Sequence, residues 1–88
     1  NNLIDQTQIG DNNDAEAAQS NGNSNGTIEQ YQEGDNNTVD ADQDGNSNST
    51  IVQFQVGNNN SSDSNQDGSS DSSTEIFMEG DNNNSDTG

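Results

Sequence analysis

The sequence contains no lysine, arginine, histidine, cysteine or proline. Without cysteine there can be no disulfide and no thiolate metal site. Without histidine the usual general base and the usual transition-metal ligand are both missing. The 17 acidic residues have no basic side chain to balance them, and the formal net charge is -17. A charge of this sign excludes nucleic-acid backbones and anionic membranes as direct partners.

Apolar residues are also scarce, at 19% hydrophobic and 3% aromatic. Low hydrophobicity with high net charge is typical of disordered chains, since ordering each residue costs roughly 1–2 kcal/mol of backbone entropy. No apolar run approaches the ~18 residues that a membrane-spanning helix needs. The chain starts at Asn1 and shows no signal peptide, so we expect a mature form or an excerpt of a longer chain. Composition therefore leaves two alternatives: disorder, or an order that does not depend on an ordinary apolar core.

A repeated segment favours order. The stretch from Ser49 to Gln66 has related copies on both sides: a step of 23 leads from Gln32 to Gln55, and a step of 24 from Gln8 to Gln32. Self-similarity at a fixed period of 20 to 50 residues is the signature of a repeat architecture. We expect a single repeat array over residues 1–88, with rungs at about 4–26, 27–49, 50–72 and 73–88, the last of them incomplete.

Each copy has the pattern strand–turn–strand–turn. Apolar and amide residues recur at every second position, which is strand periodicity, and clusters of Gly, Asp and Asn between them are turn formers. After residue 83 we expect the chain to fray. The predicted strands are 4–8, 15–19, 28–32, 39–43, 51–55, 62–66 and 74–78.

Alternation assigns the two faces of each strand. Every acidic strand residue falls on one face, and the other face carries only small, apolar and amide side chains. This segregation predicts an all-β fold, a β-solenoid in which parallel, in-register rungs stack ~4.8 Å apart into two facing cross-β sheets. We expect the first-strand isoleucines to face the column of Ala15, Val39 and Ser62. The predicted apolar core is Ile4, Ile28, Ile51, Ala15, Val39 and Ala41.

Stacked rungs place each inward glutamine over the glutamine of the next copy. A primary amide can donate to one neighbour and accept from the other, so such a ladder satisfies buried polar groups at every level. The alternative is that the columns are compositional noise in an Asn-, Gln- and Ser-rich tract. The predicted ladder glutamines are Gln6, Gln8, Gln19, Gln30, Gln32, Gln43, Gln53, Gln55 and Gln66.

The spacing Ser-x5-Gln-x4-Asn-x5-Gln, met at Ser49, Gln55, Asn60 and Gln66, resembles the curlin repeat, the unit of the bacterial curli amyloid subunit. The resemblance implies a secreted subunit that polymerises into extracellular biofilm and adhesion fibres. It also implies that the asparagine column is an internal ladder. The other copies keep the pattern in part: Gln8, Asn13 and Gln19 with Asn2 for the serine; Gln32, Asn37 and Gln43 with Gly26; Ser72 and Asn83 with Met78 for the first glutamine.

Two further columns are candidate sites. Asp11, Asp35 and Asp81, with Asn58 at the third-copy position, could bind Ca2+ between rungs, or they could be solvated turn residues. On the acidic face, the column of Tyr31, Phe54 and Phe77 that begins at Thr7 predicts a lateral contact between filaments, because apolar rows on a solvated face mark interfaces. The alternative is that these are strand-favouring residues left exposed.

Three classes of function remain open. The first is a self-assembling fibre subunit, whose partner is a further copy of itself. The second is a binding module, either a Ca2+-dependent adhesin or an ice-binding solenoid, and the third is a disordered acidic spacer. We expect no enzyme, because no carboxylate lies in an apolar setting and no base or nucleophile accompanies one. No cofactor is required by this interpretation.

Overall fold

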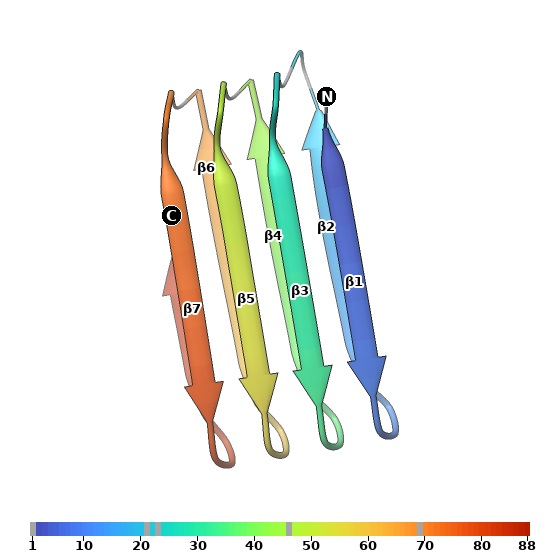
Figure 1. Cartoon of the computed structure of the whole chain (residues 1–88). Coiled ribbons are helices and arrows are strands. Elements are labelled where there is room, and N and C mark those ends of the chain that lie inside the picture. The colour runs from blue at the N-terminus through green and yellow to red at the C-terminus, as the bar shows by residue number, and fades with distance from the viewer. Residues whose placement is uncertain (1, 21, 23, 46, 69) are drawn as a thin grey trace.

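The computed structural model describes residues 2–20, 22, 24–45, 47–68 and 70–88, and in these residues all regular structure is β-strand (Figure 1). None of them belongs to a helix long and apolar enough to cross a membrane. The strands are β1 (Leu3–Ile9), β2 (Asp14–Ser20), β3 (Thr27–Glu33), β4 (Thr38–Asp44), β5 (Thr50–Val56), β6 (Ser61–Asp67), β7 (Ser73–Glu79) and β8 (Asn84–Thr87).

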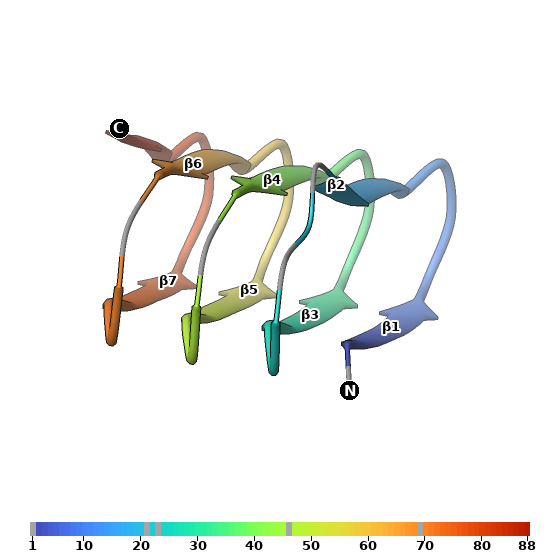
Figure 2. The same cartoon turned by 90° about the horizontal axis from the view of Figure 1, so that it is seen from above.

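The strands form two parallel four-stranded sheets, in the orders β1-β3-β5-β7 and β2-β4-β6-β8. Figure 2 shows the sheets as two layers, with the chain passing from one to the other at every turn. Each strand pairs with its equivalent in the next copy, so that Gln30 lies opposite Gln53 and Gln43 opposite Gln66. The chain is therefore a β-solenoid of about four turns with a period of ~23 residues, as the sequence predicts.

Each of the seven predicted strands, from 4–8 to 74–78, is one residue too short at both ends. The prediction followed the alternation of side chains, whereas backbone pairing between rungs continues one residue further. The predicted fraying after Asn83 is wrong. Residues Asn84 to Thr87 form β8, which pairs with Ser61 to Ser64 of β6. Backbone hydrogen bonds to an existing strand hold this segment, although its side chains are all polar. The step of 24 from Gln8 to Gln32 contains one residue more than the step of 23 that follows it, and the expected place of this extra residue, near Asn21, lies outside the described residues.

The apolar core is small. Ile28, Ile51 and Ala41 form a buried cluster, against which Ala17 packs. Val39 is buried but does not belong to this cluster, so the expected packing of the isoleucines against the Val39 column is wrong. The chain reverses direction between the two sheets. The isoleucines at the start of β3 and β5 therefore face the later part of the second-sheet strands, where Ala41 lies, and not their start, where Val39 lies.

Two predicted core residues are not buried. Ile4 is 42% exposed, and Ala15 is only partly buried. Ile4 lies in β1 and Ala15 in β2, and no described strand neighbours either of these strands on its outer side. Their column is correct, but the first rung is left uncovered. At the other end of the same sheet, Ile76 and Met78 of β7 are each only 8% exposed.

Candidate functional site

Three columns of glutamines run through the interior, parallel to the stacking direction. In the first, Nε2 of Gln6 donates to Oε1 of Gln30 at 2.8 Å, and Gln30 donates in the same way to Gln53 at 3.0 Å. The equivalent pairs are Gln8 to Gln32 (2.9 Å), Gln32 to Gln55 (3.2 Å), Gln19 to Gln43 (2.9 Å) and Gln43 to Gln66 (3.0 Å). The structure thus brings together all nine glutamines that the sequence predicts.

The same amides also tie the two sheets together, which the sequence analysis missed. Nε2 of Gln30 donates to the backbone oxygen of Glu16 at 2.8 Å, and Nε2 of Gln53 to that of Asp40 at 3.0 Å. A primary amide has two N–H groups, and the ladder uses only one of them. This spare donor is the signal in the sequence that could have predicted the bonds between the sheets.

The ladders change character at the fourth rung. Ile76 and Met78 occupy the positions in register with Gln53 and Gln55, so no amide continues these two columns. Gln53 donates instead to Oγ of Ser62 at 3.0 Å, and Gln55 donates to the backbone oxygen of Thr38 at 3.1 Å. In the third column, Gln66 donates to Oγ1 of Thr74 at 3.0 Å. Apolar and hydroxyl side chains therefore terminate the amide columns within the chain itself.

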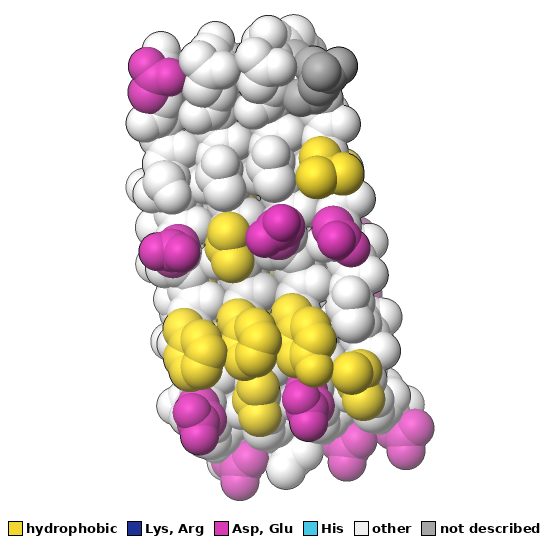
Figure 3. Space-filling model, viewed as in Figure 1, with side chains coloured by type: hydrophobic (Ala, Val, Ile, Leu, Met, Phe, Trp, Pro, Cys, Tyr) yellow, Lys and Arg dark blue, Asp and Glu magenta, His cyan; other side chains and the backbone are white. Residues whose placement is uncertain are grey.

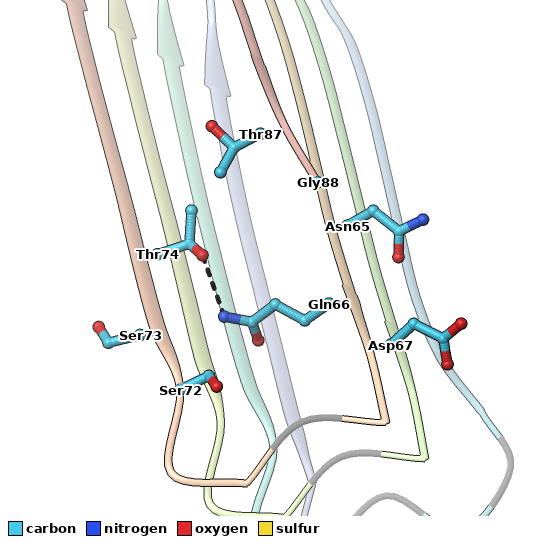
Figure 4. Close-up of a pocket in the computed structure, with 8 residues that line it drawn as sticks. All are labelled: Asn65, Gln66, Asp67, Ser72, Ser73, Thr74, Thr87 and Gly88. Atoms are coloured by element: carbon cyan, nitrogen blue, oxygen red, sulfur yellow. Dashed lines mark hydrogen bonds between the residues drawn. The ribbon is translucent and has the colours of Figure 1, made fainter.

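Figure 4 shows the hydroxyl of Thr74 on the β7 side, meeting the Gln66 amide from β6 across a cavity of about 470 Å3. The cavity exists because β8 pairs with β6 only as far as Ser64. Residues 65–67 consequently line the cavity where the earlier rungs have a paired strand. This end of the solenoid is hollow and polar.

The asparagine column is a side chain-to-backbone ladder. Oδ1 of Asn37 accepts from the backbone N–H of Asn60 at 3.0 Å, and Nδ2 of Asn37 donates to the backbone oxygen of Gly57 at 2.9 Å. Asn13 and Asn60 make the same two contacts with their next rungs, and the N–H that Asn60 accepts comes from Asn83 at 2.9 Å. These asparagines fix the distance between successive turns.

A glycine lies three positions before each of these asparagines, and the sequence predicted it only as a turn former. In the structure it also allows successive turns to approach each other closely. Gly57 has φ of 123°, and a Cβ there would lie 1.9 Å from the backbone oxygen of Gly80. Gly10 and Gly34 face the next rung in the same way. Only glycine permits this close approach, and its fixed place in every copy was the available signal.

The candidate calcium column has another role in the structure. Oδ1 of Asp35 accepts the backbone N–H of Asp11 at 2.9 Å, Asn58 accepts that of Asp35 at 3.0 Å, and Asp81 accepts that of Asn58 at 2.9 Å. Among the described residues no three His, Cys, Asp or Glu side chains cluster closely enough to hold a metal ion. Calcium binding by Asp11, Asp35 and Asp81 stays a prediction.

Carboxylates stack on the outer faces in the same register. On the second sheet Glu16 lies beside Asp40, which lies beside Asp63. Partial burial raises the pKa of Asp40 above its ordinary value, and the charges of Asp63, Glu16 and Asp42 raise it further, while a backbone hydrogen bond at Ala41 opposes the shift. The register that joins the amides inside therefore brings like charges together outside.

The aromatic column forms a continuous stack on the outer face of the first sheet. Ring centroids of Tyr31 and Phe54 are 4.7 Å apart with planes 7° apart, and those of Phe54 and Phe77 are 4.9 Å apart with planes 3° apart. Figure 3 shows this row of apolar side chains running across the strands, with acidic side chains on both sides of it. The Tyr31 hydroxyl donates to Glu33 at 3.0 Å, and this bond, with slight desolvation and the Glu33 charge, raises the pKa of Tyr31.

The fold and its columns define a β-solenoid repeat protein whose interior is held mainly by stacked amides. No family model and no curated protein matches this chain.

Proposed function

We propose that this chain is a structural subunit that assembles with further copies of itself into amyloid-like fibres. Growth occurs by end-to-end stacking, so that a rung of one copy continues the sheets of the next. The role is structural and not catalytic. An extracellular location, in a biofilm matrix or adhesion filament, follows from the resemblance to the curlin repeat.

The observation that carries the proposal is the exposure of the solenoid's first rung. All seven residues of β1 are exposed, including Leu3 at 53% and Ile9 at 51%. The outer edge of β1 faces no described strand, while its inner edge pairs with β3 through the full length of the strand. An uncovered strand edge templates the addition of another strand.

The interior of the rung supports the same conclusion. The first three rungs repeat one pattern of amides and small side chains, and Gln32 and Gln43, which have a rung on both sides, are 0% exposed. A second copy would cover Ile4, Gln6 and Gln8 with Thr74, Ile76 and Met78 of its fourth rung. Stacking therefore extends the strand pairing that each sheet already makes three times within the chain.

The side of the fibre has its own proposed contact. The row of Tyr31, Phe54 and Phe77 is a continuous apolar stack on the outer face of the first sheet, and Phe77 is 66% exposed. We assign this row to the lateral pairing of filaments into bundles.

Seeded assembly tests the proposed function. The protein is incubated in molar salt with and without sheared fragments of its own earlier assemblies, and pelletable protein is followed with time. We expect fragments to remove the lag phase, because each fragment offers a complete template rung. Protein that stays in the supernatant with and without fragments would contradict the proposal.

A further inference from the structure

The aromatic stack is interrupted at the first rung. Thr7 occupies the position in register with Tyr31, so the ring of Tyr31 has Phe54 on one side and a small side chain on the other. A shallow cavity of about 260 Å3 runs along the first three rungs between two columns, with Asp5, Glu29 and Val52 on one side and Thr7, Tyr31 and Phe54 on the other. One aromatic ring is missing from an otherwise regular row.

End-to-end stacking, on which this inference rests, would turn the gap into a slot with two aromatic walls. Phe77 of one copy would lie one rung below Thr7 of the next copy, and Tyr31 one rung above it. Two strand spacings separate these walls by roughly 9.6 Å. A planar ring midway would lie about 4.8 Å from each wall, close to the 4.7 Å and 4.9 Å between the rings of the chain itself. The slot accommodates one ring system and no more.

Carboxylates surround this slot more densely than any other part of the row. Asp5 lies in register with Glu29, and Val52 interrupts this acidic column at the third rung. The column on the other side of the rings is interrupted twice, at the first rung by Ile9 and at the third rung by Val56. At a junction, Glu75 of one copy would adjoin Asp5 of the next, with no apolar residue between them. On the other side of the row, Glu79 of one copy and Glu33 of the next would lie one rung below and one rung above Ile9. The sequence has no lysine or arginine to neutralise any of these carboxylates.

We propose that each junction between subunits binds one planar aromatic cation. The ring system stacks between Tyr31 and Phe77 above Thr7, and its positive charge relieves the repulsion among the five neighbouring carboxylates. Aromatic faces attract cations, and the attraction strengthens where water is partly excluded. The ligand class follows from a slot one ring thick with negative charge on both sides.

Thr7→Phe is the decisive variant, because it places a ring of the protein in the slot. Thr38→Phe is the matched control, since it makes the same substitution at an exposed site on the other sheet. Fibres of each protein are verified by sedimentation and are then titrated with N-methylacridinium, followed by fluorescence anisotropy. Anthracene-2-sulfonate, a planar anion of similar size, is titrated in parallel.

Wild-type and Thr38→Phe fibres are expected to bind about one N-methylacridinium per subunit. Thr7→Phe fibres and the sulfonate probe are expected to show roughly tenfold weaker binding or none. Equal binding by Thr7→Phe and wild-type fibres, or equal binding of the cation and the anion, would overturn the proposal.

Failure of the proposed function is separable from failure of this site. If wild-type protein does not assemble, the dispersed chain still offers the face of Tyr31 beside Asp5 and Glu29. If the dispersed wild-type chain then binds N-methylacridinium and the dispersed Thr7→Phe chain does not, the half of the site formed by Tyr31, Asp5 and Glu29 is supported. If the dispersed wild-type chain does not bind the probe, the site is refuted together with the proposed function.

Discussion

The inside and the outside of each rung share one register but respond to it in opposite ways. Inside, Gln30 over Gln53 gives a buried hydrogen bond of 3.0 Å. Outside, Asp40 lies over Asp63, and partial burial together with the charge of Asp63 raises the pKa of Asp40 above its ordinary value. In-register stacking therefore stabilises neutral side chains that both donate and accept, and it penalises side chains of like charge.

The two effects are of similar size for each pair of rungs. A net hydrogen bond contributes about 0.5–1.5 kcal/mol. Two unit charges ~4.8 Å apart repel by about 0.9 kcal/mol in bulk water. Salt and protonation weaken the outer term and leave the inner one nearly unchanged, so the solvent determines how readily rungs stack.

The largest expected effect comes from breaking the closest inner contact. Gly57→Ala places a Cβ 1.9 Å from the backbone oxygen of Gly80, and we expect it to lower the free energy of unfolding by roughly 3 kcal/mol or more. Gly68→Ala is the control, since a Cβ there has nothing within 4 Å although φ is also positive, at 60°. Urea unfolding of both variants measures the difference. Equal losses would mean that the conformation alone, and not the contact between turns, requires glycine.

The next effect comes from removing one member of an amide ladder. Gln55→Ala leaves the buried Nε2 of Gln32 without its ladder acceptor, which costs about 1–3 kcal/mol and recurs in every subunit of a fibre. We expect assembly to be strongly slowed or blocked, and Gln32→Ala to behave alike. Thr38→Ala on the exposed face should change little. Light-scattering time courses compare the three, and wild-type rates for both glutamine variants would refute the ladder.

The interior and the exterior also differ in how well the sequence predicts them. Residue spacing alone locates the strands and the glutamine columns, because a fixed period and strict alternation leave little freedom in register. Spacing wrongly predicted that Ile4 is buried, since alternation assigns a residue to the inner face but does not show that the first rung is uncovered on one side. Spacing also did not predict that Asn37 and Asp35 form hydrogen bonds with backbone groups of neighbouring turns. A polar turn has the same sequence pattern whether its side chains contact water or the backbone of the next turn.

A smaller effect is expected from the outer carboxylates. The folded-state pKa of Asp40 is raised above its ordinary value of 3.8, so its protonation stabilises the fold fully below pH 3.8. That stability is lost as the pH rises through the folded-state pKa. We expect assembly to be fastest near pH 4, and at neutral pH to accelerate in molar salt, where the screening length is ~3 Å, or in millimolar Ca2+.

The variant Asp40→Asn sharpens this prediction, because it removes the central carboxylate of the column and should reduce the dependence on pH and salt. Glu29→Gln, on the other sheet, is the matched control for the loss of one charge. Rates that do not change with pH or salt in the wild-type protein would show that the carboxylates are not stacked as described.

The smallest effect on stability is expected from the aromatic row. Changing Tyr31, Phe54 and Phe77 together to serine removes stacked rings on the outer face, of which Phe77 is exposed and the other two are partly buried, and it leaves the interior ladders intact. We expect single filaments to persist and bundles to disappear in electron micrographs. Bundling at the wild-type level would exclude this row as the lateral contact.

Fibre diffraction from aligned assemblies tests the central claim most directly. Continued stacking of rungs predicts a meridional reflection near 4.8 Å and an equatorial reflection near 10 Å from the two facing sheets. Wild-type protein should give both reflections, and Gly57→Ala protein prepared in the same way should give neither. Assemblies of the wild-type protein without the 4.8 Å meridional reflection would contradict growth by stacking of rungs.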